Sequence, residues 1–203
     1  MKRSHDISDL ISIFNGVFLH SHNTELVAGD DEPIYLPADQ SNPHHRIIFA
    51  HGFFASALHE IAHWCVAGAK RRTLVDFGYW YKPDGRSCEE QAEFERVEVQ
   101  PQAYEWILSE SAGHRFHFSA DNLSAGLGAS SEFMRNVHSR VLELLEQGLP
   151  ERVEALSSAL RSFYGIPLLT ADSFALERHL PAGEIYARFE NSGESLAGTV
   201  TSG

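Results

Sequence analysis

Apolar residues recur at helical spacing in several separate segments of this chain. The pattern predicts helices at residues 6–18, 53–66, 88 to about 112, 132–147 and 151–164, with a short helix after Thr170. Shorter apolar or alternating runs predict extended segments at residues 25–28, 33–36, 46–50 and 75–81. This mixture indicates an α+β fold in which the strands form a small sheet.

The segment 53–66 differs from the other predicted helices because it is apolar nearly all round. A helix without a polar face belongs in a core. Residues 46–50 are typical of a buried strand, and they run into this helix through a hinge at His51-Gly52. We therefore expect a small β-sheet packed on a central helix and surrounded by further helices, an arrangement that resembles a reduced zincin-like core.

The central helix contains the HExxH motif His59-Glu60-Ile61-Ala62-His63. At about 100° per residue the two histidines lie about 40° apart on one face, so both imidazoles can bind one metal ion. Ala55, Ser56 and Ala62 share or flank that face, and their small side chains leave room for the metal and for a ligand from another element. Glu60 stands at the rim, where such motifs place a general base or a carboxylate that orients water. The alternative is a pair of hydrogen-bonded core histidines, which explains the small neighbours less well.

A third metal ligand is usual in an open catalytic site, and a carboxylate from a following helix can supply it. In the predicted helix 88–112, both Glu98 and Glu105 lie about 50–70° from the centre of the apolar face. Each carboxylate would be solvated, paired or bound to a metal, because its burial alone is costly. Pro101 lies between them and is expected to kink the helix or to begin a new segment, so the spacing does not choose between them. Two histidines and a carboxylate suit zinc hydrolysis or non-haem iron oxygen chemistry.

Charge and composition restrict the class of protein. The 16 Lys and Arg residues against 28 Asp and Glu give a formal net charge of −12, which opposes direct binding to nucleic acid and attracts a cationic substrate. The sequence shows no signal-peptide core and no apolar run long enough to span a membrane, so we expect a cytoplasmic protein. Cys65 and Cys88 lack CxxC spacing and are expected to be reduced, packed cysteines.

The domain organisation also follows from the pattern. We expect residues 1–180 to form a single metal-dependent catalytic domain, since 203 residues suffice for one core without disulfides. Beyond Pro181 the apolar period is lost and the content of Gly, Ser, Glu and Thr rises. Residues 181–203 are therefore expected to be a mobile tail.

Five stretches of the chain are more specific than the HExxH motif alone. They are GDDEPIYLPAD at residues 29–39, FAHGFFASA at 49–57, HEIAHWC at 59–65, DFGYWY at 76–81 and VEVQPQA at 97–103. From about residue 6 to about residue 175, the chain resembles the bacterial elongation factor P hydroxylase family. The resemblance implies a metal-dependent monooxygenase that hydroxylates the modified lysine of elongation factor P after β-lysine has been attached. It also implies His59, His63 and Glu98 as the metal ligands, so Glu98 is preferred to Glu105 on this ground.

The implied reaction restricts the metal and the substrate contacts. Hydroxylation of an unactivated C–H bond needs an oxidant that no side chain provides, which favours Fe(II) over Zn(II). Candidate contacts for the substrate ammonium groups and for its long side chain are Glu60, Asp84, Glu95, the turn at residues 30–32, Tyr79, Trp80 and Tyr81. Surface charge and core packing are the simpler explanations for each of these residues.

Two other functions remain open from the sequence. The first is a zinc-dependent hydrolase or peptidase in which Glu60 acts as general base for metal-bound water. The second is a protein without catalytic activity that holds a structural metal and binds a translation factor. The bare HExxH motif favours the hydrolase, whereas the five longer stretches favour the hydroxylase.

Overall fold

The computed structural model describes residues 4–30, 32–76, 86–119 and 129–180. Its helices are α1 (Ile7–His22), α2 (Phe54–Val66), α3 (Cys88–Ala112), α4 (Ser131–Gln147) and α5 (Glu151–Tyr164). Its strands are β1 (Thr24–Ala28), β2 (Ile34–Leu36) and β3 (His45–Phe49), and short 3-10 turns lie at Arg71–Thr73, Ala171–Ser173 and Leu176–Arg178. The five long helices predicted from the sequence are confirmed, and the short helix expected after Thr170 consists of the last two of these turns.

The sheet has the strand order β1-β3-β2. Strand β3 pairs in parallel with β1 and antiparallel with β2. Ile47 and Phe49 of β3 are buried, and α2 packs against this strand. The three strands predicted before the central helix are therefore confirmed.

The fourth predicted strand, at residues 75–81, falls mostly outside the described part of the chain. Of its two described residues, Val75 is exposed and belongs to no strand. Asp76 pairs with Tyr35 of β2 through two backbone hydrogen bonds of 2.8 and 3.0 Å. The chain therefore returns to the free edge of β2 at Asp76.

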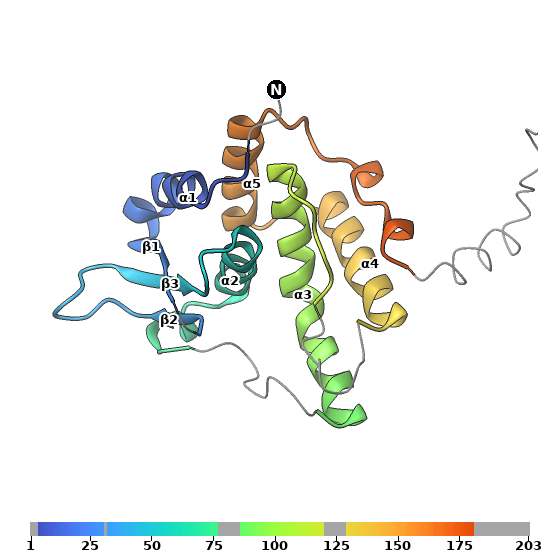
Figure 1. Cartoon of the computed structure of the whole chain (residues 1–203), viewed down its shortest axis with the longest axis horizontal. Helices are drawn as coiled ribbons and strands as arrows, with labels where there is room; N and C mark the ends of the chain where they lie inside the picture. Colours follow the sequence, from blue (N-terminus) through green and yellow to red (C-terminus); the bar gives the residue numbers. More distant parts are fainter. Residues whose placement is uncertain (1–3, 31, 77–85, 120–128, 181–203) are drawn as a thin grey trace, which may run out of the picture.

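Helix α2 lies between the sheet and α3 (Figure 1), and its residues Leu58 and Ile61 are fully buried. His51 and Gly52 connect it to β3 with positive φ angles of 58° and 67°. Two successive left-handed residues make a sharp turn, which glycine adopts freely and histidine adopts only at a steric cost. The predicted hinge is thus a sharp turn between β3 and the HExxH helix, which packs against that strand.

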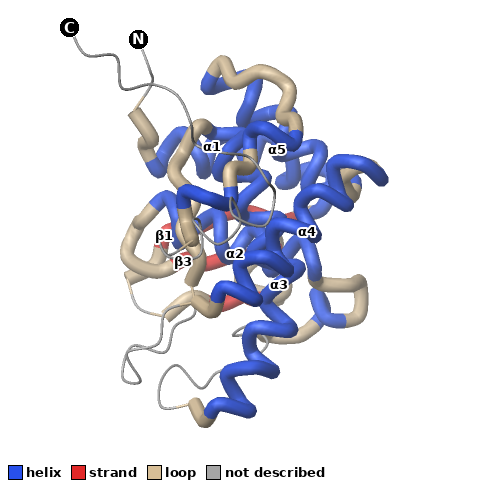
Figure 2. The backbone as a smooth tube through the Cα atoms, turned by 90° about the vertical axis from the view of Figure 1, so that its right-hand side faces the viewer, coloured by secondary structure: helices blue, strands red, loops and turns tan. Residues whose placement is uncertain are grey.

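Helix α3 is the longest of these helices and packs against the HExxH helix α2. Ser87 and Glu90 form a capping box at its start, and the left-handed Gly113 ends it. The helix runs through Pro101 in one piece, so the alternative that a new segment begins there is wrong. Its first turns project beyond the rest of the molecule in two views (Figures 1 and 2). Residues 101–109 are buried, and α3 packs against α2, α4 and α5.

The arrangement is the predicted α+β fold, with a small sheet on a central helix and further helices around it. Figure 2 shows the strands behind the helices, with α2 in front of them. None of the described helices is long and apolar enough to cross a membrane. Their packing brings α2 and α3 side by side, which places the polar residues of the two helices in contact.

Candidate metal centre

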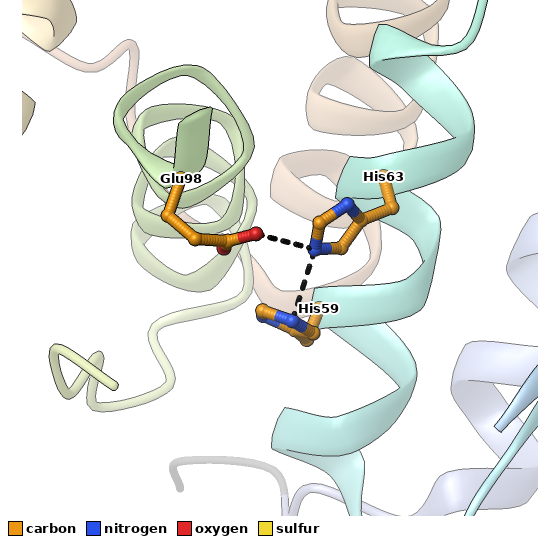
Figure 3. Close-up of side chains that lie close together, drawn as sticks. All are labelled: His59, His63 and Glu98. Atoms are coloured by element: carbon orange, nitrogen blue, oxygen red, sulfur yellow. Dashed lines mark hydrogen bonds and ion pairs between the residues drawn. The ribbon is translucent and has the colours of Figure 1, made fainter. Parts of the chain in front are cut away.

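His59 and His63 lie one turn apart on α2 and point to the same side of the helix (Figure 3). Their Nε2 atoms are 3.1 Å apart, and their ring centroids are 4.6 Å apart. The two side chains are 25% and 14% exposed, respectively. The predicted common face of the two histidines is confirmed, and it is partly accessible to solvent.

Glu98 reaches the same point from α3. Its Oε1 atom lies 3.4 Å from His63 Nε2, and the residue is only 4% exposed. Burial alone would raise the pKa of Glu98, but the contact with His63 and the charges of both histidines lower that pKa below its usual value. No described residue donates a hydrogen bond of normal geometry to the buried Oε2 atom, although the nearby Gln102 side chain also contributes to the lowered pKa of Glu98.

The distances in this group fit a single bound cation. Two atoms that bind one metal ion at about 2.1 Å lie roughly 3.0 to 3.5 Å apart in tetrahedral or octahedral geometry. The contacts of 3.1 and 3.4 Å fall in this range, and the three ligand atoms all lie within 4.8 Å of one another. A buried carboxylate oxygen without a partner also calls for a cation, because such atoms are rarely left unsatisfied. The donor set of two imidazoles and a carboxylate suits zinc or non-haem iron.

Glu105, the other candidate for the third ligand, lies on the opposite side of His59. Its Oε2 atom accepts a hydrogen bond from His59 Nδ1 at 2.8 Å, and the residue is 7% exposed. Burial lowers the pKa of His59, but the carboxylates of Glu105, Glu60 and Glu98 outweigh it and raise this pKa to about 10. The structure therefore brings Glu98, and not Glu105, to the two Nε2 atoms.

Glu60 stands beside the three-residue group and does not join it. The residue is half-buried and lines a recess on the adjoining face of α2 together with His63. The rest of the lining consists of Tyr35, Ile47, Trp64, Ala67, Arg71, Arg72 and Asp76. Burial raises the pKa of Glu60, although the two histidines of the motif oppose this shift. A carboxyl group that holds its proton more tightly than usual suits a role in proton transfer.

Among the other candidate substrate contacts, the described Glu95 is engaged away from this centre. The Glu95 carboxylate accepts hydrogen bonds from the backbone N–H and the hydroxyl of Ser130 at 3.2 and 2.6 Å, so it joins α3 to the start of α4. Asp84 and the aromatic residues 79–81 lie outside the described residues. Cys65 is a buried free thiol whose pKa is raised to about 12 by burial, as expected for a packed cysteine.

Arg152 of α5 supports the motif helix, and the sequence pattern did not indicate this role. Its guanidinium group donates to the backbone carbonyls of Trp64, Cys65 and Ala67 at 2.7, 3.0 and 3.0 Å. It also lies 4.7 Å from the centroid of the Trp64 ring. These carbonyls close the C-terminal end of α2, where a cation is favourable. Only a basic residue on a predicted amphipathic helix was visible in the sequence, and that signal is too common to be specific.

Comparisons with known proteins agree with this site. Residues 13–174 match the protein family described as elongation factor P hydroxylase. A curated relative from Haemophilus influenzae, named elongation factor P lysine hydroxylase, is 56% identical over 160 residues, which cover 79% of this chain and 90% of the relative. The matched region contains both histidines of the motif and both candidate glutamates of α3. The chain therefore belongs to the elongation factor P hydroxylase family.

Proposed function

We propose that this protein is a metal-dependent monooxygenase that hydroxylates the β-lysylated lysine of translation elongation factor P. One observation carries the proposal: His59, His63 and Glu98 converge on one point in a chain of the elongation factor P hydroxylase family. The name of the Haemophilus influenzae relative supports a lysine of this factor as the target. The relative is named for the hydroxylation of a lysine of elongation factor P. The proposed metal dependence and monooxygenase chemistry go beyond that name and are supported by the group His59, His63 and Glu98.

We propose His59 Nε2, His63 Nε2 and the Glu98 carboxylate as the metal ligands. Conversion of C–H to C–OH by O₂ places one oxygen atom in the product and the other in water, and it requires two electrons from an external donor and two protons. Fe(II) would supply the redox chemistry that side chains and Zn(II) both lack. A set of three protein ligands leaves coordination positions open, as non-haem iron oxygenases require.

Glu60 is the proposed catalytic carboxylate. It lies next to His63 in the wall of the recess, and burial raises its pKa. From this position it can orient an ammonium group of the substrate, hold a water molecule, or deliver a proton. An obligatory role as general base is required only in a hydrolase, where a water molecule must be deprotonated.

Several properties of the whole chain are consistent with this proposal. The net charge of −12 favours a substrate that carries ammonium groups and disfavours direct contact with nucleic acid. A cytoplasmic location and a single catalytic domain over residues 1–180 suit modification of a translation factor. The likeness of α2 and the sheet to a reduced zincin-like core is part of the same proposal.

The deciding experiment is metal loading followed by mass analysis of the substrate. The metal-free protein is loaded anaerobically with Fe(II) or with Zn(II), mixed with β-lysylated elongation factor P and a chemical reductant, and exposed to O₂. We expect a gain of one oxygen atom on the modified lysine with Fe(II) and none with Zn(II). A Glu98→Ala variant should lose both the metal and the oxygen gain.

The alternatives give different results in the same assay. Cleavage of a peptide or amide bond by the Zn(II) form, without oxygen gain by the Fe(II) form, would overturn the proposal in favour of a zinc hydrolase. Binding of elongation factor P without any mass change in either form would indicate a structural metal and a non-catalytic protein.

A further inference from the structure

The two carboxylates that α3 directs toward α2 contact different histidine nitrogens. Glu98 lies 3.4 Å from His63 Nε2, whereas Glu105 lies 2.8 Å from His59 Nδ1. The two nitrogens of the His59 ring point in divergent directions, so Nδ1 faces α3 at Glu105 while Nε2 faces His63 at 3.1 Å. Glu105 therefore contacts the His59 ring from the side away from the proposed metal.

Helix periodicity explains why one helix can supply both carboxylates. Residues 98 and 105 are seven positions apart, and at about 100° per residue they lie within about 20° of each other on the helix surface. Because α3 runs through Pro101 as a single helix, both glutamates face α2 at two heights separated by about two turns. His59 and His63 are one turn apart on α2, so each histidine meets one of the two carboxylates.

The tautomer of His59 follows from this contact. A histidine binds a metal ion only as the neutral imidazole, which carries one N–H, and a carboxylate can only accept a hydrogen bond from it. The hydrogen bond to Glu105 therefore places the proton on Nδ1 and leaves the Nε2 lone pair directed at His63 and Glu98. Without this acceptor, the ring can take the other tautomer or rotate about its side-chain bonds, and both changes remove the lone pair from the metal position.

Because Glu105 is buried, its carboxylate needs a hydrogen-bond partner, and His59 Nδ1 provides one. Glu105 is 7% exposed, and a buried carboxylate without a partner is costly. The contact is a short hydrogen bond between an acidic and an imidazole group, the kind that commonly orients metal-binding histidines. Within the described residues, no other side chain has a hydrogen bond to His59 Nδ1.

We propose that Glu105 is a positioning residue of the metal centre, which orients the His59 ring and fixes its tautomer so that Nε2 is presented to the metal. The inference rests on the proposed metal-binding function. It assigns separate roles to the two glutamates that the sequence offered as alternatives for one role. Its direct consequence is that loss of Glu105 lowers metal affinity although Glu105 does not touch the metal.

The test compares Glu105→Leu with Glu105→Gln in anaerobic Co(II) titrations followed by visible absorption. Leucine fills a similar volume and cannot accept a hydrogen bond, whereas glutamine keeps an acceptor oxygen. We expect Glu105→Leu to bind Co(II) about 10 to 100-fold more weakly than the wild type, and Glu105→Gln to recover most of this loss. In the Zn(II)-loaded protein, the slowly exchanging His59 Nδ1–H proton should be visible by NMR in the wild type and absent in Glu105→Leu.

Two control variants separate the possible failures. Ser111→Ala removes a buried hydroxyl of α3 that bonds to Ile107 and Ser157, and it should leave Co(II) affinity unchanged. His59→Ala should abolish tight binding. If the wild type itself binds no Co(II), the proposed metal site is wrong. If the wild type binds and His59→Ala does not, while folded Glu105→Leu binds as tightly as the wild type, the positioning role is overturned and the metal site stands.

If Glu105→Leu does not fold, the Co(II) affinity and the NMR spectrum of Glu105→Gln provide the test. A retained His59 Nδ1–H signal together with affinity closer to the wild type than to His59→Ala supports the role. Loss of that signal with unchanged Co(II) affinity contradicts it.

Discussion

Replacement of Arg152 by alanine should destabilise the protein by about 3 kcal/mol. The change removes three hydrogen bonds from a charged donor to the carbonyls at the end of α2, each worth about 1.5 to 3 kcal/mol in isolation. It also removes a cation–π contact with Trp64 worth roughly 0.5 to 1 kcal/mol. The expected loss of stability is smaller than the sum of these four values, because water can enter the vacated space and the Ala67 carbonyl keeps a second donor in Arg72.

This estimate can be measured by thermal unfolding followed by circular dichroism. For a domain of this size, about 3 kcal/mol corresponds to a fall in Tm of roughly 6 to 12 °C. Arg152→Lys should lose about half as much, since a single ammonium group cannot reach all three carbonyls in fixed geometry. Arg96→Ala is the control: within the described part of the chain Arg96 pairs with the exposed Glu93 on α3, and its loss should leave Tm unchanged. A destabilisation below about 1 kcal/mol in Arg152→Ala would refute the role of this residue in closing α2.

Three further predictions concern the site and the core. His59→Ala and His63→Ala should each lose tight metal binding while the far-ultraviolet circular dichroism spectrum is retained, because the apolar core is independent of the metal; one tightly bound equivalent in either variant would show that the ligand assignment is wrong. Glu60→Gln should keep its metal and part of its activity, because an amide retains some of the hydrogen bonding; complete loss of elongation factor P hydroxylation, with metal and substrate binding intact, would make proton transfer by this residue essential. Ser157→Ala should cost about 1 kcal/mol in urea unfolding, since it removes the buried 2.8 Å hydrogen bond to Ser111, and an unchanged unfolding midpoint would contradict this.

The sequence alone determined the five long helices, the three strands before α2 and the first half of the site. The 3.6-residue period located α2, and the i, i+4 spacing within it placed His59 and His63 on one face, as the structure confirms. Both results depend only on local geometry, because a helix fixes the relative directions of its own side chains. The same argument predicted that Glu98 and Glu105 both lie near the buried face of α3.

The tertiary structure alone decided which glutamate meets which nitrogen. Both glutamates lie on the same face, so their roles depend on how far α3 is shifted along α2, and that shift is set by packing between residues distant in sequence. Arg152 is a second example, since it closes the end of α2 from more than 80 residues away in the chain. Local periodicity carries no information about such offsets, because they result from the joint fit of helices around a common core.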